Sequence, residues 1–459
     1  MPKRPTSRQQ DAATSANPFI RNSTEQHAHE TQDERDSRIG RAHDAQRISL
    51  DIDIEIAEAK KAWDRKAKAV KILLLGQAES GKSTVLKNFQ IAFTPKHFAR
   101  QRAAWRMVIQ MNLIKSVKTI LEALEEEWGA SYASPPTDRR HTVTSNHRRL
   151  RMALSPLLVL DTSLNRLLSP STGSDSPREL SVRAGSPWQL LLSPTSETFQ
   201  RSTRVRSPTG SSEDLTRVVA ACRQDIIALW EDSAVREVLR DREVSLEASS
   251  GFFLHDTARI ATADYEPTDA DIVRARIRTM GVEEHKFVME TTDVGSEYYL
   301  IDVGGSRSMR AQWIPFFENV NAIIFLAPLI FNQVLEEDSN VNRLQDSLGL
   351  WKEICGTRLL QHTNIILFLN KIDVLQETLA SGVRVQKYVT SYGDLPNDFL
   401  NVVGYFKAKF MGLHRRLSPK PRPFLCYETS AIDTQAMSTM LHGVREMLLR
   451  NNLEKAAVI

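Results

Sequence analysis

Short apolar runs recur along the chain and alternate with amphipathic stretches. The first run, at residues 70–75, is closed by Gly76, and others lie at 298–302, 322–327, 364–370 and 424–429. Helical patterns lie between and after them, for example at 340–354 and 434–449. Uninterrupted apolar runs are typical of strands buried on both faces, and their alternation with helices favours parallel pairing through right-handed crossovers. The pattern therefore predicts an α/β domain, formed by residues 70–93 and 269–459, whose mostly parallel sheet is flanked by helices.

The stretch from residue 94 to 268 breaks this rhythm, because it contains amphipathic helices, near 108–124 and 215–239, and no convincing strand. We expect an inserted all-helical domain here. Inside it, at about 131–212, Ser-Pro steps begin at Ser134, Ser155, Ser169, Ser176, Ser186, Ser193 and Ser207. Each proline removes an amide donor and disfavours helix at the residue before it. Most of this Ser/Pro-rich segment is therefore predicted to be disordered.

The chain before the first apolar run differs in composition. Residues 1–46 are polar with hardly an apolar side chain, which predicts a disordered tail. Residues 47–69 are rich in Ala, Glu and Lys, which favours a helix, although residues 50–56 also alternate as a strand would.

Charge and cysteine content narrow the class of protein. Lys and Arg number 60 against 56 Asp and Glu, an excess too small for a chain that neutralises many nucleic-acid phosphates. The longest apolar stretch, at 322–331, is about half of the ~18 residues that a membrane span needs. Three well-separated cysteines form no disulfide framework. We therefore expect a cytoplasmic protein without a transmembrane segment or a nucleic-acid partner.

A phosphate-binding loop follows the first strand. Residues 76–83, Gly-Gln-Ala-Glu-Ser-Gly-Lys-Ser, fit the pattern G-x-x-x-x-G-K-[ST] between a strand and a helix that starts near Lys82. Its glycines allow backbone amides to turn toward a β-phosphate, and the helix N-terminus adds partial positive charge. Lys82 would span the β- and γ-phosphates, and the Ser83 hydroxyl would ligate Mg²⁺.

Two later motifs indicate which base is bound. Asn370-Lys371-Ile372-Asp373 ends an apolar run, and the Asp373 carboxylate can accept both the N1–H and the 2-amino group of guanine, which adenine does not offer. Thr429-Ser430-Ala431 follows the last strand and could hold guanine O6 with backbone amides. An Asn-Lys-x-Asp string alone is weak, but after a phosphate loop it becomes strong.

Residues 302–305, Asp-Val-Gly-Gly, close another strand with the pattern D-x-x-G. Asp302 would hold Mg²⁺ through water. The Gly305 amide could approach a γ-phosphate, because glycine has no side chain. Alone, such a string is most often a turn.

In this order, with helices inserted between them, these motifs resemble the alpha subunits of heterotrimeric G proteins. The resemblance runs from about residue 47 to the end, apart from the Ser/Pro-rich segment. Residues 77–84 depart from the family string only in its early glycine–alanine order, and 273–281 resemble switch I. Residues 302–305 open switch II, and 368–373 nearly match the base-binding string. A divergent, fungal-like member is expected, with a Ras-like GTPase domain and an all-helical lid.

The resemblance also implies roles for single residues. Arg276 would be the arginine finger supplied in cis, and Glu79 would pair with it and latch the lid. Thr279 would be the second protein ligand of Mg²⁺. Further contacts to the nucleotide are implied for Gly76, Ser80, Gly81, Thr84, Ser249 and Arg274.

The chain departs from the family at the residue after Gly305. Ser306 stands where the glutamine that orients the attacking water is expected, and a serine hydroxyl is too short for that task. Arg276 and Mg²⁺ would still supply electrostatic stabilisation. We therefore expect nucleotide binding with slow GTP hydrolysis.

Membrane attachment departs as well. Position 2 is Pro2, which cannot be myristoylated, and no cysteine precedes Cys222. Without an N-terminal lipidation signal, we expect the protein in the cytoplasm, or held at the plasma membrane by partners. By resemblance these are a beta-gamma dimer, against the N-terminal helix and switch II, and a seven-helix receptor at the apolar tail, 451–459.

Three interpretations remain open. The first is a signalling GTPase with impaired hydrolysis, supported by Arg276 and Thr279. The second is a nucleotide-gated scaffold without meaningful catalysis, supported by Ser306. A third, an ATP-dependent kinase, is disfavoured by Asp373.

Overall fold

The computed structural model describes residues 31–133, 145–168, 181–183, 212–242, 244–247, 249–291 and 296–457. The chain divides into two units, residues 1–68 and 69–459. In the first unit, helix α3 (Gln32–Lys68) begins 15 residues earlier than the predicted 47, so the prediction of disorder is wrong for residues 32–46. Charged side chains of opposite sign, spaced one turn apart, stabilise this solvated helix. For example, Arg47 Nη2 lies 3.5 Å from Asp44 Oδ1. Residues 1–30 lie outside the described part.

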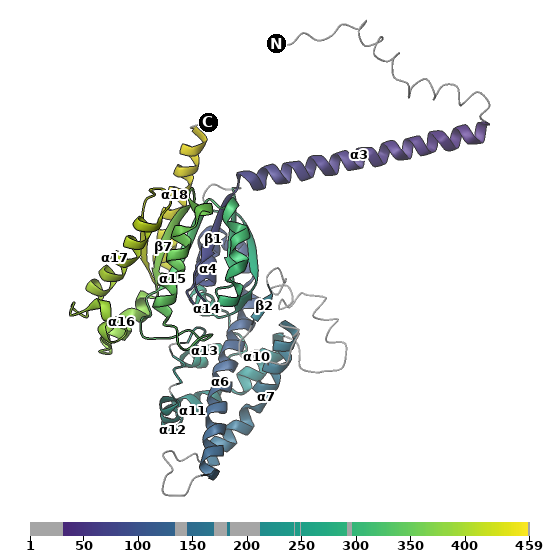
Figure 1. Ribbon diagram of the computed structural model, residues 1–459. Coiled ribbons are helices and arrows are strands. Elements are labelled where there is room, and N and C mark those ends of the chain that lie inside the picture. Colours follow the sequence, from purple (N-terminus) through teal and green to yellow (C-terminus); the bar gives the residue numbers. More distant parts are fainter. Residues whose placement is uncertain are drawn as a thin grey trace. The chain divides into compact units, whose positions relative to one another are not determined.

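The second unit contains a six-stranded sheet with the order β4-β5-β1-β6-β7-β8 (Figure 1). Its strands are β1 (Val70–Leu75), β4 (Val282–Val288), β5 (Glu297–Val303), β6 (Ala322–Pro328), β7 (Asn364–Asn370) and β8 (Leu425–Thr429). All neighbours pair in parallel except β4, which is antiparallel to β5. The predicted mostly parallel sheet is confirmed. Strand β4 escaped prediction because its pattern is half polar, with Glu283, Glu284, His285 and Lys286 in sequence.

Helices cover both faces of this sheet. They are α4 (Lys82–Phe93), α15 (Arg343–Gly356), α16 (Ile372–Ala380), α17 (Phe399–Leu417) and α18 (Thr434–Ala457), with the 3₁₀ segment η3 (Arg307–Asn319). Alternate residues of β1 point to opposite faces: Leu73 packs with Trp351 and Phe410 of α15 and α17, whereas Ile72 packs in the core that contains Phe89 of α4. The apolar residues of β1, β6 and β7 are thus buried on both faces of the sheet, whereas β8, at the edge, is mostly half-buried.

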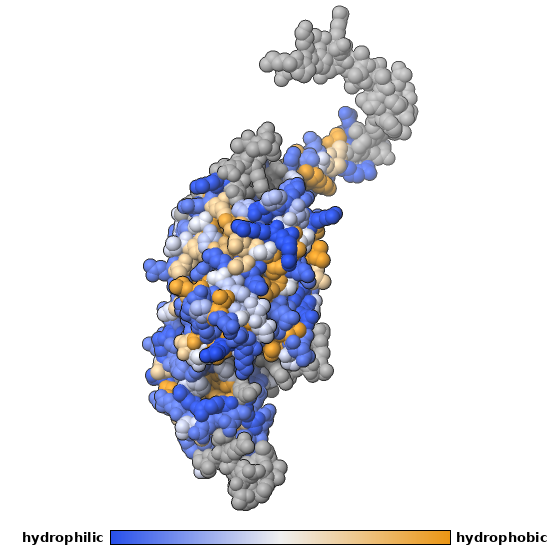
Figure 2. Space-filling view, turned by 60° about the vertical axis from the view of Figure 1, so that its left-hand side comes forward, coloured by the Kyte–Doolittle hydropathy of each residue, from blue (hydrophilic) through white to orange (hydrophobic). Residues whose placement is uncertain are grey.

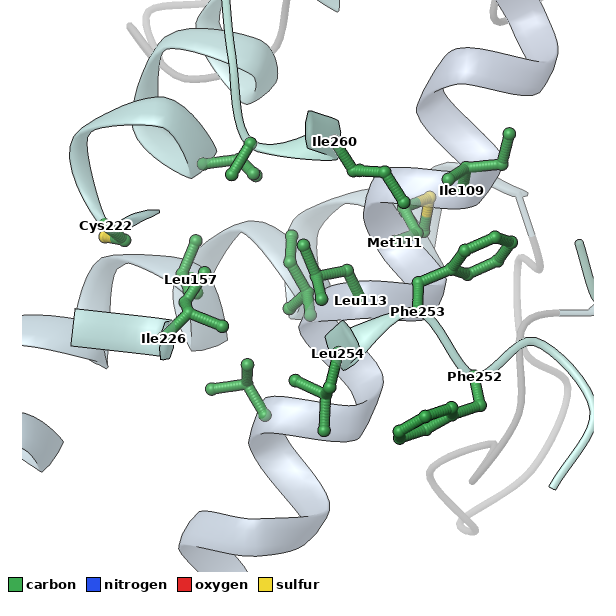
Figure 3. Packing of buried hydrophobic residues seen from close by; sticks show 14 of the residues in the cluster. Ile109, Met111, Leu113, Leu157, Cys222, Ile226, Phe252, Phe253, Leu254 and Ile260 are labelled. Atoms are coloured by element: carbon green, nitrogen blue, oxygen red, sulfur yellow. The ribbon is translucent and has the colours of Figure 1, made fainter. Parts of the chain in front are cut away.

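The helices between α4 and β3 share a core of their own. They are α5 (Pro95–Arg100), α6 (Arg102–Ala133), α7 (Ser145–Leu168), α10 (Ser212–Ala221), α11 (Arg223–Glu231), α12 (Ser233–Asp241), α13 (Thr257–Ile260) and α14 (Asp269–Arg274), with the short η2 (Leu254–Asp256). Figure 3 shows Leu113 of α6 beside Leu157 of α7, Ile226 of α11 and Leu254 of η2. All four are buried at 3% exposure or less. This packing explains why residues 94–268 read as amphipathic helices.

Helix α7 contradicts the predicted disorder for residues 145–168. Residues 134–144, 169–180 and 184–211 of the Ser/Pro-rich segment lie outside the described part. Leucines at positions 150, 154, 157, 160 and 164 recur at helical spacing, and all are buried. Pro156 lies inside the helix and removes one amide donor. Burying five leucines stabilises the helix by roughly 1.5–3 kcal/mol each, which exceeds the ~3 kcal/mol cost of an internal proline.

A second correction concerns strands. Strand β2 (Ser181–Arg183) lies within the region where none was expected, and it pairs in parallel with β3 (Arg278–Met280). Three residues are too few for a recognisable hydrophobic period, so the sequence pattern could not reveal this strand.

The surface is mixed in character. Figure 2 shows hydrophilic and hydrophobic residues interspersed over one face of the molecule. Among the described residues, every helix is too short or too polar to cross a membrane.

Candidate nucleotide site

The loop after β1 has the backbone shape that a phosphate loop requires. Gly76 and Gly81 adopt φ angles of +145° and +101°, in the left-handed half of the map where glycine costs least. A Cβ atom on Gly76 would lie 2.5 Å from the Leu326 carbonyl oxygen of β6. These two positions therefore exclude side chains, and the loop wraps directly onto the ends of the parallel strands.

Lys82 begins helix α4 and folds back over this loop. Its ammonium donates to the carbonyl oxygens of Gly76 (2.9 Å) and Gln77 (2.8 Å). Burial lowers the pKa of Lys82 to about 8, while Asp302 opposes that shift. A buried cation held by two neutral carbonyls is only partly compensated, so an anionic ligand such as a phosphate would stabilise its charged form.

Asp302, at the C-terminal end of β5, faces the start of α4. The Ser83 hydroxyl donates to its Oδ2 at 2.7 Å, whereas its buried Oδ1 has no hydrogen-bond partner among the described residues. Burial raises the pKa of this carboxyl, and Lys82 and Ser83 lower it. An orphaned carboxylate oxygen beside a hydroxyl is a donor set that suits Mg²⁺, which binds hard oxygen ligands and keeps several waters.

Gly305 packs against the phosphate loop. A Cβ atom there would lie 2.5 Å from both the Ala78 nitrogen and Lys82 Nζ. The backbone of residues 304–305 thus reaches the phosphate loop only because glycine has no side chain. Ser306 follows, is 4% exposed, and its hydroxyl lies 3.4 Å from that of Ser308.

Asn370 joins three segments that are far apart in sequence. Its amide nitrogen donates to the Ser80 carbonyl of the phosphate loop (2.8 Å). Its amide oxygen accepts from the Thr429 hydroxyl (3.0 Å) and the Ala431 amide (3.1 Å). The Asn-Lys-x-Asp string, the phosphate loop and the loop after β8 are therefore held together by one buried side chain.

A cavity of about 560 Å³ lies between these segments. Its lining includes the predicted residues Glu79, Gly81, Lys82, Ser83, Thr84, Ser249, Arg274, Arg276, Gly305, Ser306, Asn370, Lys371, Asp373 and Ala431. Of the other predicted residues, Gly76, Ser80, Asp302 and Ser430 do not line the cavity. Thr279 is in β3, but its side chain lies outside the described part.

Two cavity residues, Ser249 and Arg274, form hydrogen bonds with neighbouring protein groups. Ser249 donates its hydroxyl to the Leu246 carbonyl at 2.6 Å. Arg274 donates to the Phe252 carbonyl and to Asp256, each at 2.9 Å. Both side chains are thus engaged by the helical part of the chain in this structure.

Glu79 lies between two arginines. It forms ion pairs with Arg276 and with Arg343 at the start of α15, and Glu336 lies 4.0 Å from Arg276. Burial lowers the pKa of Arg276, and Glu336 opposes this. Sequence reasoning proposed the Glu79–Arg276 pair but missed Arg343, which is 264 positions away from Glu79.

The backbone of Arg276 is held by Asn112 of α6. The Arg276 amide donates to Asn112 Oδ1 at 2.7 Å, and Asn112 Nδ2 donates to the Arg276 carbonyl at 2.9 Å. Gly251, at φ +81°, packs on this pair, since a Cβ there would lie 2.9 Å from both Arg276 Cβ and Asn112 Oδ1. A helix of the inserted region thus fixes the arginine from both sides, which no sequence motif announced.

The segment after Gly305 is fixed by α15. Arg310 forms two hydrogen bonds with Asp346, at 2.9 and 2.7 Å, and Trp313 donates to the Gly304 carbonyl at 3.0 Å. These contacts hold η3 against the sheet and place Ser306 at the cavity.

Comparison with known proteins places this arrangement in a family. The family model described as "G-protein alpha subunit" matches residues 46–448 of this chain. The chain belongs to the G-protein alpha subunit family. It is 31% identical to the guanine nucleotide-binding protein alpha-4 subunit of Mycosarcoma maydis, over 86% of this chain and 84% of the relative. It is 30% identical to the alpha-1 subunit of the same organism, over 88% and 94%, and 29% identical to a guanine nucleotide-binding protein alpha subunit of Sporothrix schenckii, over 85% and 91%.

Membership in this family confirms the resemblance seen in the sequence and the predicted fold class. Alpha subunits bind GDP and GTP, are GTPases, and act in signalling with a beta-gamma dimer and receptors. In this alpha subunit, Ser306 and Ala78 lie where the loop after β5 meets the phosphate loop.

Proposed function

We propose that this alpha subunit is a guanine-nucleotide switch that binds GDP and GTP with Mg²⁺ and hydrolyses GTP slowly. The observation that carries the proposal is a single cavity lined at one end by Lys82 and Ser83 and at the other by Lys371 and Asp373. Asn370 ties these two ends together. A nucleoside diphosphate or triphosphate has charges and hydrogen-bonding groups at matching ends.

Ser83 and Asp302 would hold Mg²⁺, with Thr279 as a further ligand. When bound, the ion would neutralise charge on the β- and γ-phosphate oxygens. Lys82, already buried and partly desolvated, would exchange its two carbonyl partners for phosphate oxygens. The remaining nucleotide contacts would come from the backbone of 76–84 and from Thr84, Ser430 and Ala431.

Hydrolysis would depend on residues from two segments at the phosphate end of the cavity. Arg276, released from Glu79, would neutralise charge that develops on the γ-phosphoryl group, and the Gly305 amide would bind the same group. Ser306 lines the cavity where the attacking water would stand, but its hydroxyl cannot span the distance that a glutamine amide covers. Electrostatic stabilisation is thus retained while positioning of the water is lost.

The test is a time course of radiolabelled GTP binding and phosphate release by the purified protein with Mg²⁺. We expect saturable binding that guanine nucleotides compete for and ATP does not, followed by slow phosphate release. Absence of calorimetric heat for both GDP and GTP would refute the switch. Binding without any release would instead favour the second candidate, a nucleotide-gated scaffold, which Ser306 already supports.

Asn112 offers a prediction about the arginine. Asn112→Ala removes both hydrogen bonds to the Arg276 backbone, so the guanidinium loses its fixed position. We expect GTP hydrolysis to fall by up to about 30-fold, because two neutral hydrogen bonds of ~1 kcal/mol each are lost, while GDP affinity changes less than twofold. Single-turnover hydrolysis and nucleotide titration measure the two quantities.

A double variant separates positioning from general destabilisation. In an Arg276→Ala background, Asn112→Ala should leave hydrolysis unchanged, since the group that it positions is gone. Additive losses in the double variant would show that Asn112 does not act through Arg276.

The partners follow from the same assignment. A beta-gamma dimer would bind helix α3 and the η3 segment of switch II, and a seven-helix receptor would bind the end of α18. These partners would hold the protein at the cytoplasmic face of the plasma membrane.

A further inference from the structure

Strand β2 brings the Ser/Pro-rich segment to the backbone of switch I. Its register places Val182 opposite Thr279, with Ser181 opposite Arg278 and Arg183 opposite Met280. Strand β3 joins β4 through Gly281, whose φ is +99°. Strand β3, which precedes the edge strand β4 of the six-stranded sheet, therefore pairs with a strand from elsewhere in the chain.

Strand β3 stands outside the six-stranded sheet, and within the described residues its strand partner is β2. The edge of a strand presents amide and carbonyl groups that bind an extended segment largely regardless of its side chains. The edge of β3 is thus a strand-docking surface, already occupied by three residues of the same chain.

We propose that this edge of switch I is a docking surface for β2, and that the docked strand restrains switch I and slows nucleotide release. The proposal rests on the proposed nucleotide function. Switch loops must rearrange when a γ-phosphate arrives or leaves, so a strand that pairs with one arrangement stabilises it against the others.

The connections of β2 support an intramolecular occupant. Helix α7 ends at Leu168 and α10 begins at Ser212, so β2 is tethered by 12 residues on one side and 28 on the other. Such tethers give an effective concentration in about the millimolar range. That suffices for a short pairing which would be too weak between separate molecules.

The sequence around β2 limits the pairing to a few residues. Pro177 and Pro187 flank a stretch of nine residues without proline, and neither proline can donate to a ladder. A short ladder is only marginally stable, so it can open when switch I rearranges. A longer one would hold the switch permanently.

The test replaces two adjacent residues of β2 with proline, which has no amide hydrogen. Both are needed because only every second residue of a strand donates toward a given neighbour. In Ser181→Pro/Val182→Pro, we expect hydrogen exchange of the amides in Arg278–Met280 to become about 10-fold faster. Release of a fluorescent GDP analogue should become severalfold faster. The matched control Ser181→Thr/Val182→Ile keeps both amides and favours strand, so it should behave as wild type.

Both variants should melt at the wild-type temperature, since the helices on either side of β2 are untouched. Unchanged exchange in β3 would overturn the docking, and faster exchange with unchanged GDP release would overturn the restraint. If the wild-type protein bound no nucleotide, the proposed function would fail, yet hydrogen exchange in β3 would still test the docking.

Discussion

Ser306→Gln should accelerate single-turnover GTP hydrolysis on the order of 10²-fold. Ser306 is 4% exposed but lines the cavity, so a longer side chain can extend into the space near the phosphate end. A glutamine amide would accept from the attacking water and donate toward the γ-phosphoryl oxygen, which restores the positioning that serine lacks. Phosphate release measured from the preloaded protein after Mg²⁺ addition gives the rate, and GTP affinity should stay within about twofold.

The control for this gain is Ser306→Ala. Because the serine hydroxyl is expected to contribute nothing to water positioning, alanine should leave the slow rate unchanged. A rate that falls in Ser306→Ala would show that the serine itself acts on the water. A rate that does not rise in Ser306→Gln would show that another feature limits hydrolysis, with the Ala78 methyl group in the same cavity as the next residue to change.

Asp373→Asn should reverse the preference for the base. Two hydrogen bonds from guanine to a carboxylate are worth roughly 1.5–3 kcal/mol each, so GDP affinity should fall about 10²- to 10⁴-fold. The asparagine amide nitrogen would donate to the C2 oxygen of xanthine, which replaces the 2-amino group of guanine. Xanthosine diphosphate should therefore bind the variant more tightly than GDP does. Competition for a fluorescent nucleotide measures both affinities.

The wild-type protein provides the matched control, because it should reject xanthosine diphosphate. Equal loss of both nucleotides in Asp373→Asn, at an unchanged melting temperature, would mean that Asp373 stabilises the loop rather than binding the base. An unchanged preference for guanine would place the base elsewhere in the cavity.

The parts of the site that could be predicted are those in which chemistry lies within a few consecutive residues. Gly76, Gly81 and Lys82 occur at fixed spacing after a strand, and the structure gives the two glycines the positive φ angles of a tight loop, over which Lys82 folds back. The same holds for Asn370, which ends a strand whose apolar run was visible in the sequence. Parallel strands then bring such strand ends to one edge of the sheet.

Other parts depend on contacts between distant segments. Asn112 and Arg276 are 164 positions apart, and Arg343 is 264 positions from Glu79. A lone asparagine or arginine on an amphipathic helix gives no sign of its partner, because helical periodicity reports only which face is buried. Sequence reasoning therefore found the arginine but not the residues that hold it.

Two errors in the predicted fold have a common physical cause. Pro156 argues locally against helix, and β2 is too short to show a period, but burial and backbone pairing outweigh these local preferences. For α3, the low apolar content suggested a tail, whereas interleaved charges favour a solvated helix.

By itself, the sequence determined the alternation of buried strands and helices, the phosphate-loop pattern, the Asn-Lys-x-Asp string from which we propose base binding, and the serine at position 306. Each depends on residues that are neighbours along the chain, whose spacing fixes their backbone shape or their chemistry. Only the tertiary structure decided that Asn112 grips the arginine, that Arg343 shares Glu79, and that β2 pairs with switch I. These depend on which surfaces meet after burial of the two cores, and that is a property of packing.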